Sequence, residues 1–352
     1  MVLRPAKKRQ PFFDLVKLTM MLWVVWGHLG LYGIVDSEAS IYMDNAKIGV
    51  NMPVFFVLSG YFAASTFERK GWLDIVARAG SYVWPHVTIP LVSAMLWMVV
   101  FRVGAVSALG HVHFYWFLRT LAMVYLLCAL VYRLANKDLW RWLLFGLAYL
   151  AMVFWPETLR FWWCSQVIHM YPYFVFGLMV LSRHEFHLDK RVSAACGAVF
   201  LLAVFFGGDF VSRGMNFWKS SPYWEALLHS RKWLFTFFAR TAVGIAGSIF
   251  VLSLAGSLAK LFPHVRRLAP LGLTSLGVYV VHEYPLILIG KYAAFSPAPA
   301  WSRWIIAIGW FLACHFAVLL IRHFSASRFL FFGDEAWMRR RLATIFHKCG
   351  AR

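Results

Sequence analysis

The chain contains 352 residues, of which 61% are hydrophobic and 14% are charged. Soluble domains average about 45–50% apolar and about 25% charged residues, so this composition excludes an ordinary soluble protein. The net charge of +20 would suit a nucleic-acid-binding protein only if the cations shared one surface. The five cysteines stand singly, without a C-x-x-C pair, so we expect neither a metal site nor a disulfide framework.

Apolar segments recur along the whole chain, and many approach the roughly 20 residues that cross a bilayer. We therefore expect an all-α integral membrane protein with about ten transmembrane helices, in one domain over residues 1–352. In chain order, the hydropathy pattern predicts spans at 12–34, 48–66, 82–102, 113–132, 139–155, 163–182, 192–206, 233–257, 268–290 and 304–321. A basic tail precedes them at 1–11, and a second one follows at 322–352.

The distribution of cations predicts the orientation of these spans. Most of the 35 Lys and Arg residues fall in the segments that share a side with the two termini. The positive-inside rule then places both termini in the cytoplasm. The basic excess would face the anionic headgroups of the inner leaflet, which leaves no support for a nucleic-acid partner.

Several ionisable side chains lie inside the predicted spans, where each costs about 2.5–3.5 kcal/mol and usually faces a cavity or a partner. At 1.5 Å of rise per residue, six of them share one depth in the outer half of the membrane: His28, Arg119, His169, Arg240, His282 and Glu283. This convergence predicts the wall of a water-accessible cavity open to the outside. Taken singly, His169 could also be a packing residue, and either arginine could snorkel to the headgroups.

Two spacings sharpen this picture. Lys17 and His28, eleven residues apart, fall within about 20° of one helix face and about 16 Å apart along it. Ser275, Tyr279 and His282 follow i, i+4, i+7 and also share a stripe. Lys17 additionally lies three residues after Asp14, and an intrahelical ion pair would be sufficient to explain both charges.

The segments that carry these residues resemble the membrane-bound acyltransferase family 3. In that family the first span has a basic residue, ten further positions and then a histidine, as Lys17 and His28 stand here. The similar segments are FFDLVKLTMMLWVVWGH (12–28), NMPVFFVLSGYF (51–62), YWFLRTL (115–121) and SLGVYVVHEYPL (275–286). The resemblance extends over essentially the whole chain.

The resemblance implies an O-acyltransferase of the bacterial inner membrane that spans it several times. Such enzymes move an acyl group, usually acetyl, from cytoplasmic acetyl-CoA or another acyl-CoA to a sugar hydroxyl. The acceptor would be an exported or surface polysaccharide, either free or lipid-linked. Acyl-CoA would be a co-substrate, and no bound cofactor is expected.

The resemblance also implies roles for the polar residues. Neutral imidazole is the commonest general base, and His28 would remove the proton of the sugar hydroxyl, or would carry the acyl group itself. His282, with Tyr279 or Glu283, would orient His28 or bind the acceptor. Arg119 or Arg240 would stabilise negative charge on the carbonyl oxygen. The expected substrate-binding set is completed by Ser275, Tyr279 and His169.

The donor would be met on the cytoplasmic side. Lys17 and Arg78 are the candidates for contacting the phosphates of CoA. The family often has R-x-x-R in the loop after the second span, and here Arg78 is followed by Ser81 at the second position. A transporter or exporter of a lipid-linked glycan or a small molecule is the main alternative, because it too would have a polar cavity between spans.

Overall fold

The computed structural model describes residues 10–35, 41–102, 115–153, 164–183, 189–206, 231–292, 297–333 and 335–350. Within these ranges the regular secondary structure is helical, apart from one isolated β-bridge between Val35 and Ala298. The protein is therefore all-α, as the sequence predicts. Nearly all of the N-terminal tail predicted at 1–11 lies outside the described residues.

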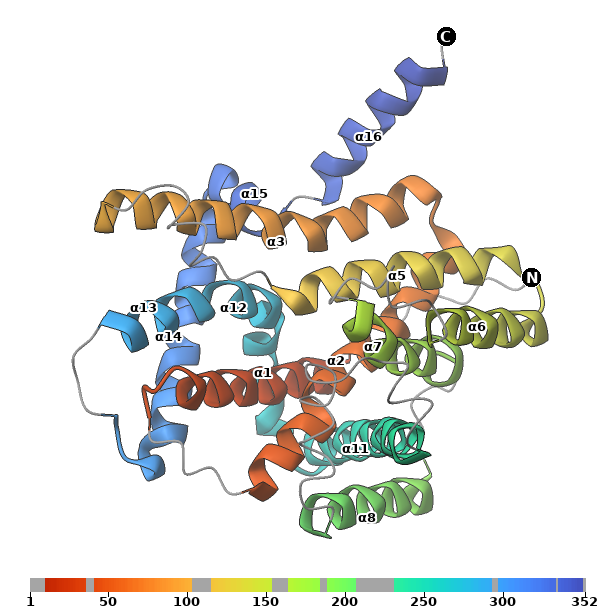
Figure 1. Cartoon of the computed structure of the whole chain (residues 1–352), viewed down its shortest axis with the longest axis horizontal. Coiled ribbons are helices and arrows are strands. Elements are labelled where there is room, and N and C mark those ends of the chain that lie inside the picture. Colours follow the sequence, from red (N-terminus) through yellow and green to blue (C-terminus); the bar gives the residue numbers. More distant parts are fainter. Residues whose placement is uncertain are drawn as a thin grey trace.

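The helices are of very different lengths, and several are interrupted (Figure 1). They are α1 (Pro11–Leu31), α2 (Ile41–Arg69), α3 (Trp72–Phe101), α5 (Trp116–Leu134), α6 (Asp138–Val153), α7 (Cys164–Phe176) with the π-helical turn η2 (Gly177–Leu181), α8 (Lys190–Phe206), α11 (Arg231–Leu261), the 3₁₀ segment η3 (Pro263–Thr274), α12 (Ser275–Val281), α13 (Glu283–Tyr292), the 3₁₀ turn η4 (Ala300–Ser302), α14 (Arg303–His323), α15 (Ser325–Phe332) and α16 (Glu335–Gly350).

Six helical segments of the described chain are long and apolar enough to cross a membrane, which makes this an integral membrane protein. They are Pro11–Leu31, Gly49–Arg69, Trp72–Val99, Trp116–Leu134, Phe238–Leu261 and Ala300–His323. A seventh is added if Pro263–Val281 and Glu283–Lys291 form one bent span. Helices also occupy the other predicted spans, as α6, α7 with η2, and α8, but these are shorter. A count of ten and the cytoplasmic termini stay predictions.

Helix α1 lies at the centre of the molecule, between α11 and the α12–α13 pair (Figure 1). It packs against η3, α14, α11 and α2, and most of its side chains are buried on more than one face. In contrast, α6, α8 and α14 leave many large apolar side chains exposed. Helices that are apolar on the outside suit a lipid solvent, so α1 is better shielded from it than α6, α8 and α14 are.

Helix α2 crosses α7 and η2 at two glycines, where the two backbones approach closely. Gly60 faces the backbone carbonyl of Phe174, and Gly177 faces the backbone carbonyl of Val57. A Cβ atom on either glycine would overlap the opposing carbonyl oxygen. Small residues let membrane helices approach closely and gain van der Waals contact. The glycine of the motif NMPVFFVLSGYF therefore serves packing.

The chain bends by 46° between η3–α12 and α13, at His282. Pro285 lies three residues later, and proline has no N–H to bond the carbonyl four residues back. The imidazole Nδ1 of His282 lies 3.1 Å from the carbonyl of Val278 and 2.9 Å from that of Tyr279. Proline and a side chain that bonds the helix carbonyls are both recognised causes of kinks. The bend thus holds His282 at a break in a helix.

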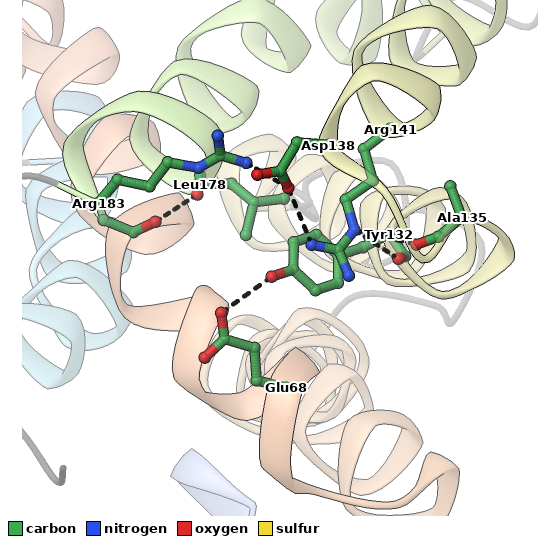
Figure 2. Close-up of polar contacts among 8 residues, drawn as sticks. Glu68, Tyr132, Ala135, Asp138, Arg141, Leu178 and Arg183 are labelled. Atoms are coloured by element: carbon green, nitrogen blue, oxygen red, sulfur yellow. Dashed lines mark hydrogen bonds and ion pairs between the residues drawn. The ribbon is translucent and has the colours of Figure 1, made fainter. Parts of the chain in front are cut away.

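A polar network joins the ends of α2, α5 and α6 to the turn after η2 (Figure 2). The carboxylate of Asp138 forms ion pairs with Arg183 at 2.7 Å and Arg141 at 3.2 Å. Arg141 also donates to the carbonyls of Tyr132 and Ala135, and its guanidinium lies 3.9 Å from the Tyr132 ring centroid. The Tyr132 hydroxyl donates to Glu68 at 3.0 Å. Four segments that are distant in sequence are tied together here by charge and hydrogen bonds.

Candidate active site

The two predicted catalytic histidines are in direct contact. His28, in the last turn of α1, lies with its Nδ1 2.8 Å from Nε2 of His282, at the bend between α12 and α13. The centroids of the two imidazole rings are 4.9 Å apart. His282 is fully buried, whereas His28 is partly accessible. The structure therefore brings together two residues that are 254 positions apart in the sequence.

The hydrogen bonds around this histidine pair determine its tautomers. A backbone carbonyl can only accept, so Nδ1 of His282, which faces the carbonyls of Val278 and Tyr279, carries a hydrogen. In neutral His282 the other ring nitrogen, Nε2, must then accept. The donor to it is the Nδ1–H of His28, which leaves the lone pair of neutral His28 on Nε2. His28 is thus oriented as a proton acceptor at Nε2.

Glu283 follows His282 but makes a different contact. Its carboxylate accepts a hydrogen bond of 2.7 Å from the hydroxyl of Tyr32, the residue that follows α1 as its C-cap. The Tyr32 ring also stacks on that of His28, with 5.8 Å between centroids. Gly290 of α13 allows this approach, because a Cβ there would meet the Tyr32 carbonyl. Glu283 therefore ties α13 to the end of α1 beside the histidine pair.

Helix α14 supports both histidines through residues that sequence reasoning missed. Arg303 is buried, and it donates to the carbonyls of Trp26 and Gly27, at 2.9 and 3.4 Å, just before His28. Its guanidinium also lies 3.7 Å from the Trp26 ring centroid. Trp310, two helical turns later on the same face, donates its indole N–H to the carbonyl of His282 at 3.3 Å. One helix face therefore contacts the backbone at each histidine.

A cavity of about 230 Å³ lies beside this site. Its lining includes four of the predicted residues, namely Lys17, Arg78, Ser275 and Tyr279, together with apolar side chains from α1, α2 and α5. The Tyr279 ring is 5.8 Å from that of His282, centroid to centroid. The cavity therefore extends from two cations to the neighbour of the histidine pair.

The two cations of this cavity are held differently. Lys17 pairs with Asp14 at 3.1 Å, as the i, i+3 spacing predicts, and its Nζ lies 5.2 Å from the Phe62 ring centroid. Arg78 bonds the Tyr82 hydroxyl at 3.2 Å. Ser81, at the position of the family's second arginine, donates to the carbonyl of Arg78. The cavity thus has one motif arginine, and the serine caps the backbone instead of adding charge.

The other predicted polar residues make their described contacts around α7. Arg119 donates to the side chain of Gln166 at 3.1 Å. Arg240 is buried within electrostatic range of His169, and its carbonyl accepts the hydroxyl of Tyr173 at 3.3 Å. The structure thus joins His28 with His282, whereas Arg119 of α5 and Arg240 of α11 contact residues of α7, the helix that carries His169.

Fold and site together define an integral membrane protein in which two histidines are in contact next to a cavity lined by Lys17 and Arg78. Such a pair suits proton transfer during acyl transfer to a hydroxyl. The family model described as an acyltransferase domain matches residues 10–322, so the chain belongs to membrane acyltransferase family 3. This membership confirms the resemblance seen in the four sequence segments. No curated protein and no solved structure matches the chain.

Proposed function

We propose that this membrane acyltransferase transfers an acyl group, most simply acetyl, from acyl-CoA to a sugar hydroxyl of an exported or surface polysaccharide. The observation that carries the proposal is the contact between His28 and His282 beside a cavity that holds Lys17 and Arg78. A hydroxyl acceptor needs a base and a thioester donor needs cations for its phosphates, and this site offers both.

The first step of the proposed reaction is attack of the hydroxyl on the thioester. Nε2 of His28 takes the hydroxyl proton as the oxygen bonds to the thioester carbonyl carbon. The imidazolium that forms keeps its Nδ1–H bond to His282, which spreads the charge into a second ring. Neutral His282 cannot turn its donor face to His28, because the carbonyls of Val278 and Tyr279 hold its Nδ1–H.

The second step is departure of the thiolate. The carbon–sulfur bond breaks as the carbonyl re-forms, and the proton on His28 passes to the thiolate to give free CoA and the sugar ester. Atoms and charges balance without any metal or cofactor. No group has to carry the acyl chain in this direct route, which is why we favour His28 as a base over His28 as a nucleophile.

In this proposal the donor binds at the Lys17 end of the cavity. Lys17 lies about 16 Å along α1 from His28, on the same face, so an extended thioester arm could start at one residue and react at the other. Lys17 and Arg78 would bind the phosphates, and the arm would pass Ser275 and Tyr279, which line the same cavity, on its way to His28. The acceptor would approach His28 from the outer side of a bacterial inner membrane.

The test is to count acetyl esters on the surface polysaccharide by NMR in cells whose only copy carries His28→Ala. His315→Ala is the matched control, since His315 is a buried histidine of α14 that bonds Thr274 outside the pair. We expect His28→Ala to remove acetyl esters while polymer yield and protein level stay normal. Loss of the polymer itself, with normal acetylation of the remainder, would favour the exporter instead.

A further inference from the structure

The C-terminal helix α16 lies beyond residues 10–322, the part of the chain that matches the family model. It nevertheless packs on α3, near the position where Ser81 replaces the second motif arginine. Met338 lies against Gly80, and the Trp337 ring is 4.5 Å from that of Phe329 and 6.3 Å from that of Trp84, between centroids. In Figure 1 the far end of α16 extends away from the other helices. Its first turns are thus fixed by apolar contacts.

These contacts leave a groove of about 500 Å³ between α16 and the start of α3. Its charged lining consists of Lys70, Asp74, Glu335, Arg339 and Arg340. Arg339 pairs with Asp74 at 3.0 Å, and 60% of its side chain is exposed. No ion pair is seen for Lys70 or Arg340 within the described ranges. The groove therefore presents two cations without a carboxylate partner and a third in a weak, solvated pair.

The groove lies one helical turn along α3 from the cavity of the candidate active site. Asp74 of the groove and Arg78 of the cavity are one turn apart on α3, which places them on one helix face. The carboxylate of Glu335, in the groove, is within electrostatic range of Arg78. A ligand that bridges the two spaces would meet Arg78 and Lys17 on one side and the α16 cations on the other.

We propose that α16 and Lys70 form a phosphate-binding site for the nucleotide end of the acyl-CoA donor, and this inference rests on the proposed function. Arg340 and Lys70 would bind phosphate directly. Arg339 would leave Asp74 and bind phosphate instead. A partly exposed ion pair contributes no more free energy than the charge-assisted hydrogen bonds to phosphate that would replace it. Helix α16 thereby supplies cations on the side of α3 where Ser81 stands at the position of the family's second arginine.

Three consecutive arginines of α16 differ in position, so Arg341 serves as the matched control for Arg339 and Arg340. Arg339 and Arg340 line the groove, whereas Arg341 does not and lies over the Trp337 ring. We would titrate CoA into the purified full-length protein in nanodiscs of zwitterionic lipid. The variants are Arg340→Gln, the double variant Arg339→Gln/Arg340→Gln, and Arg341→Gln. Melting temperatures would establish that each variant is folded, and Arg340→Gln keeps the Arg339–Asp74 ion pair.

We expect the dissociation constant for CoA to rise about tenfold in the double variant, less in Arg340→Gln, and not at all in Arg341→Gln. Equal affinities in all variants would overturn this inference alone. A wild-type protein that does not bind CoA would overturn the donor assignment of the proposed function as well. If the variants bind CoA normally but retain less anionic lipid, measured by mass spectrometry of nanodiscs containing phosphatidylglycerol, the groove is a headgroup site and the donor proposal is wrong.

Discussion

The histidine pair, His28 with His282, and the glycine crossing, Gly60 with Gly177, each include a residue of a family-like sequence segment, yet they depend on opposite properties. His28 and His282 are useful because ring nitrogens meet at 2.8 Å. Gly60 and Gly177 are useful because nothing protrudes from them, so the α2 and α7–η2 backbones touch. One region needs a particular functional group, and the other needs the absence of one.

This difference shows that a motif is not a list of catalytic residues. In NMPVFFVLSGYF, Ser59 lines the cavity while the adjacent Gly60 faces α7. In SLGVYVVHEYPL, His282 belongs to the pair, whereas Pro285 contributes to the bend that places it. Substitutions in the histidine pair should reduce activity in a protein that still folds. Substitutions in the glycine crossing should reduce the amount of folded protein.

The largest effect is expected for Gly60→Ala. The new methyl group would overlap the Phe174 carbonyl and the Leu178 nitrogen, which are backbone atoms and cannot move aside alone. We expect a loss of about 3 kcal/mol or more of unfolding free energy, measured as a lower melting temperature and lower yield in detergent. Gly146→Ala is the control, since a Cβ at Gly146 meets nothing within 4 Å. If both variants melt like the wild type, the close crossing does not exist.

The next largest effect is expected for His282→Ala. Without the acceptor at Nε2, neither the tautomer nor the orientation of His28 is fixed, and the charge that forms on His28 has no neighbouring ring. General-base catalysis contributes about 10²–10⁴-fold, and we expect kcat to fall about 10²-fold with little change in KM for acyl-CoA.

For this prediction, purified enzyme, a radiolabelled acyl donor and a melting curve are the measurements, and His315→Ala is again the control. His315 is buried and bonds Thr274. His315→Ala therefore measures the effect of removing a buried histidine that is not part of the pair. Wild-type turnover in His282→Ala would remove His282 from the mechanism.

Much of this site could be predicted from the sequence, because helix geometry fixes which residues share a face. The spacing of Lys17 and His28, and that of Ser275, Tyr279 and His282, identified residues that the structure places at one cavity or one contact. An ionisable side chain in an apolar segment is also a strong signal by itself. Helix geometry alone could not predict the contact of the two histidines, which the family resemblance offered as one of two roles for His282, since the contact depends on how α12 packs on α1.

Other features lacked a sequence signal. Arg303 stands at the end of a predicted outer loop, where arginine is ordinary, and only the fold shows it buried against α1. Depth along a span grouped Arg119, His169 and Arg240 with the histidines, but depth does not report which way a side chain points around a helix. The described hydrogen bonds of Arg119 and Arg240 therefore lie at α7, and Arg119 is also within electrostatic range of His86 on α3.

A smaller effect is expected for Arg303→Lys. Lysine keeps the charge but cannot donate to two carbonyls in a fixed plane or stack on Trp26 in the same way. The last turn of α1 would lose its support, and His28 would be held less firmly against His282. We expect kcat to fall about tenfold, since misplacement by about 1 Å is enough to slow a reaction substantially.

The matched control for Arg303→Lys is Arg322→Lys, at the other end of α14, where the guanidinium lies over the Phe332 ring. A fall in kcat for both variants alike would mean that α14 is sensitive to any arginine loss, and that Arg303 does not specifically position His28. Melting temperatures of the two variants complete the measurement.

The smallest effect is expected for Asp138→Asn, in the network of Figure 2. Its carboxylate has two arginine partners, but 55% of the Asp138 side chain is exposed. Exposed ion pairs contribute about 0–1 kcal/mol, so the melting temperature should fall slightly and kcat should not change. High salt should shrink the difference from wild type, because it screens exposed charges. We expect the residues of this network to affect stability and not turnover. A large loss of activity in Asp138→Asn would contradict this, because it would show that the Asp138 ion pairs affect catalysis at the histidine pair.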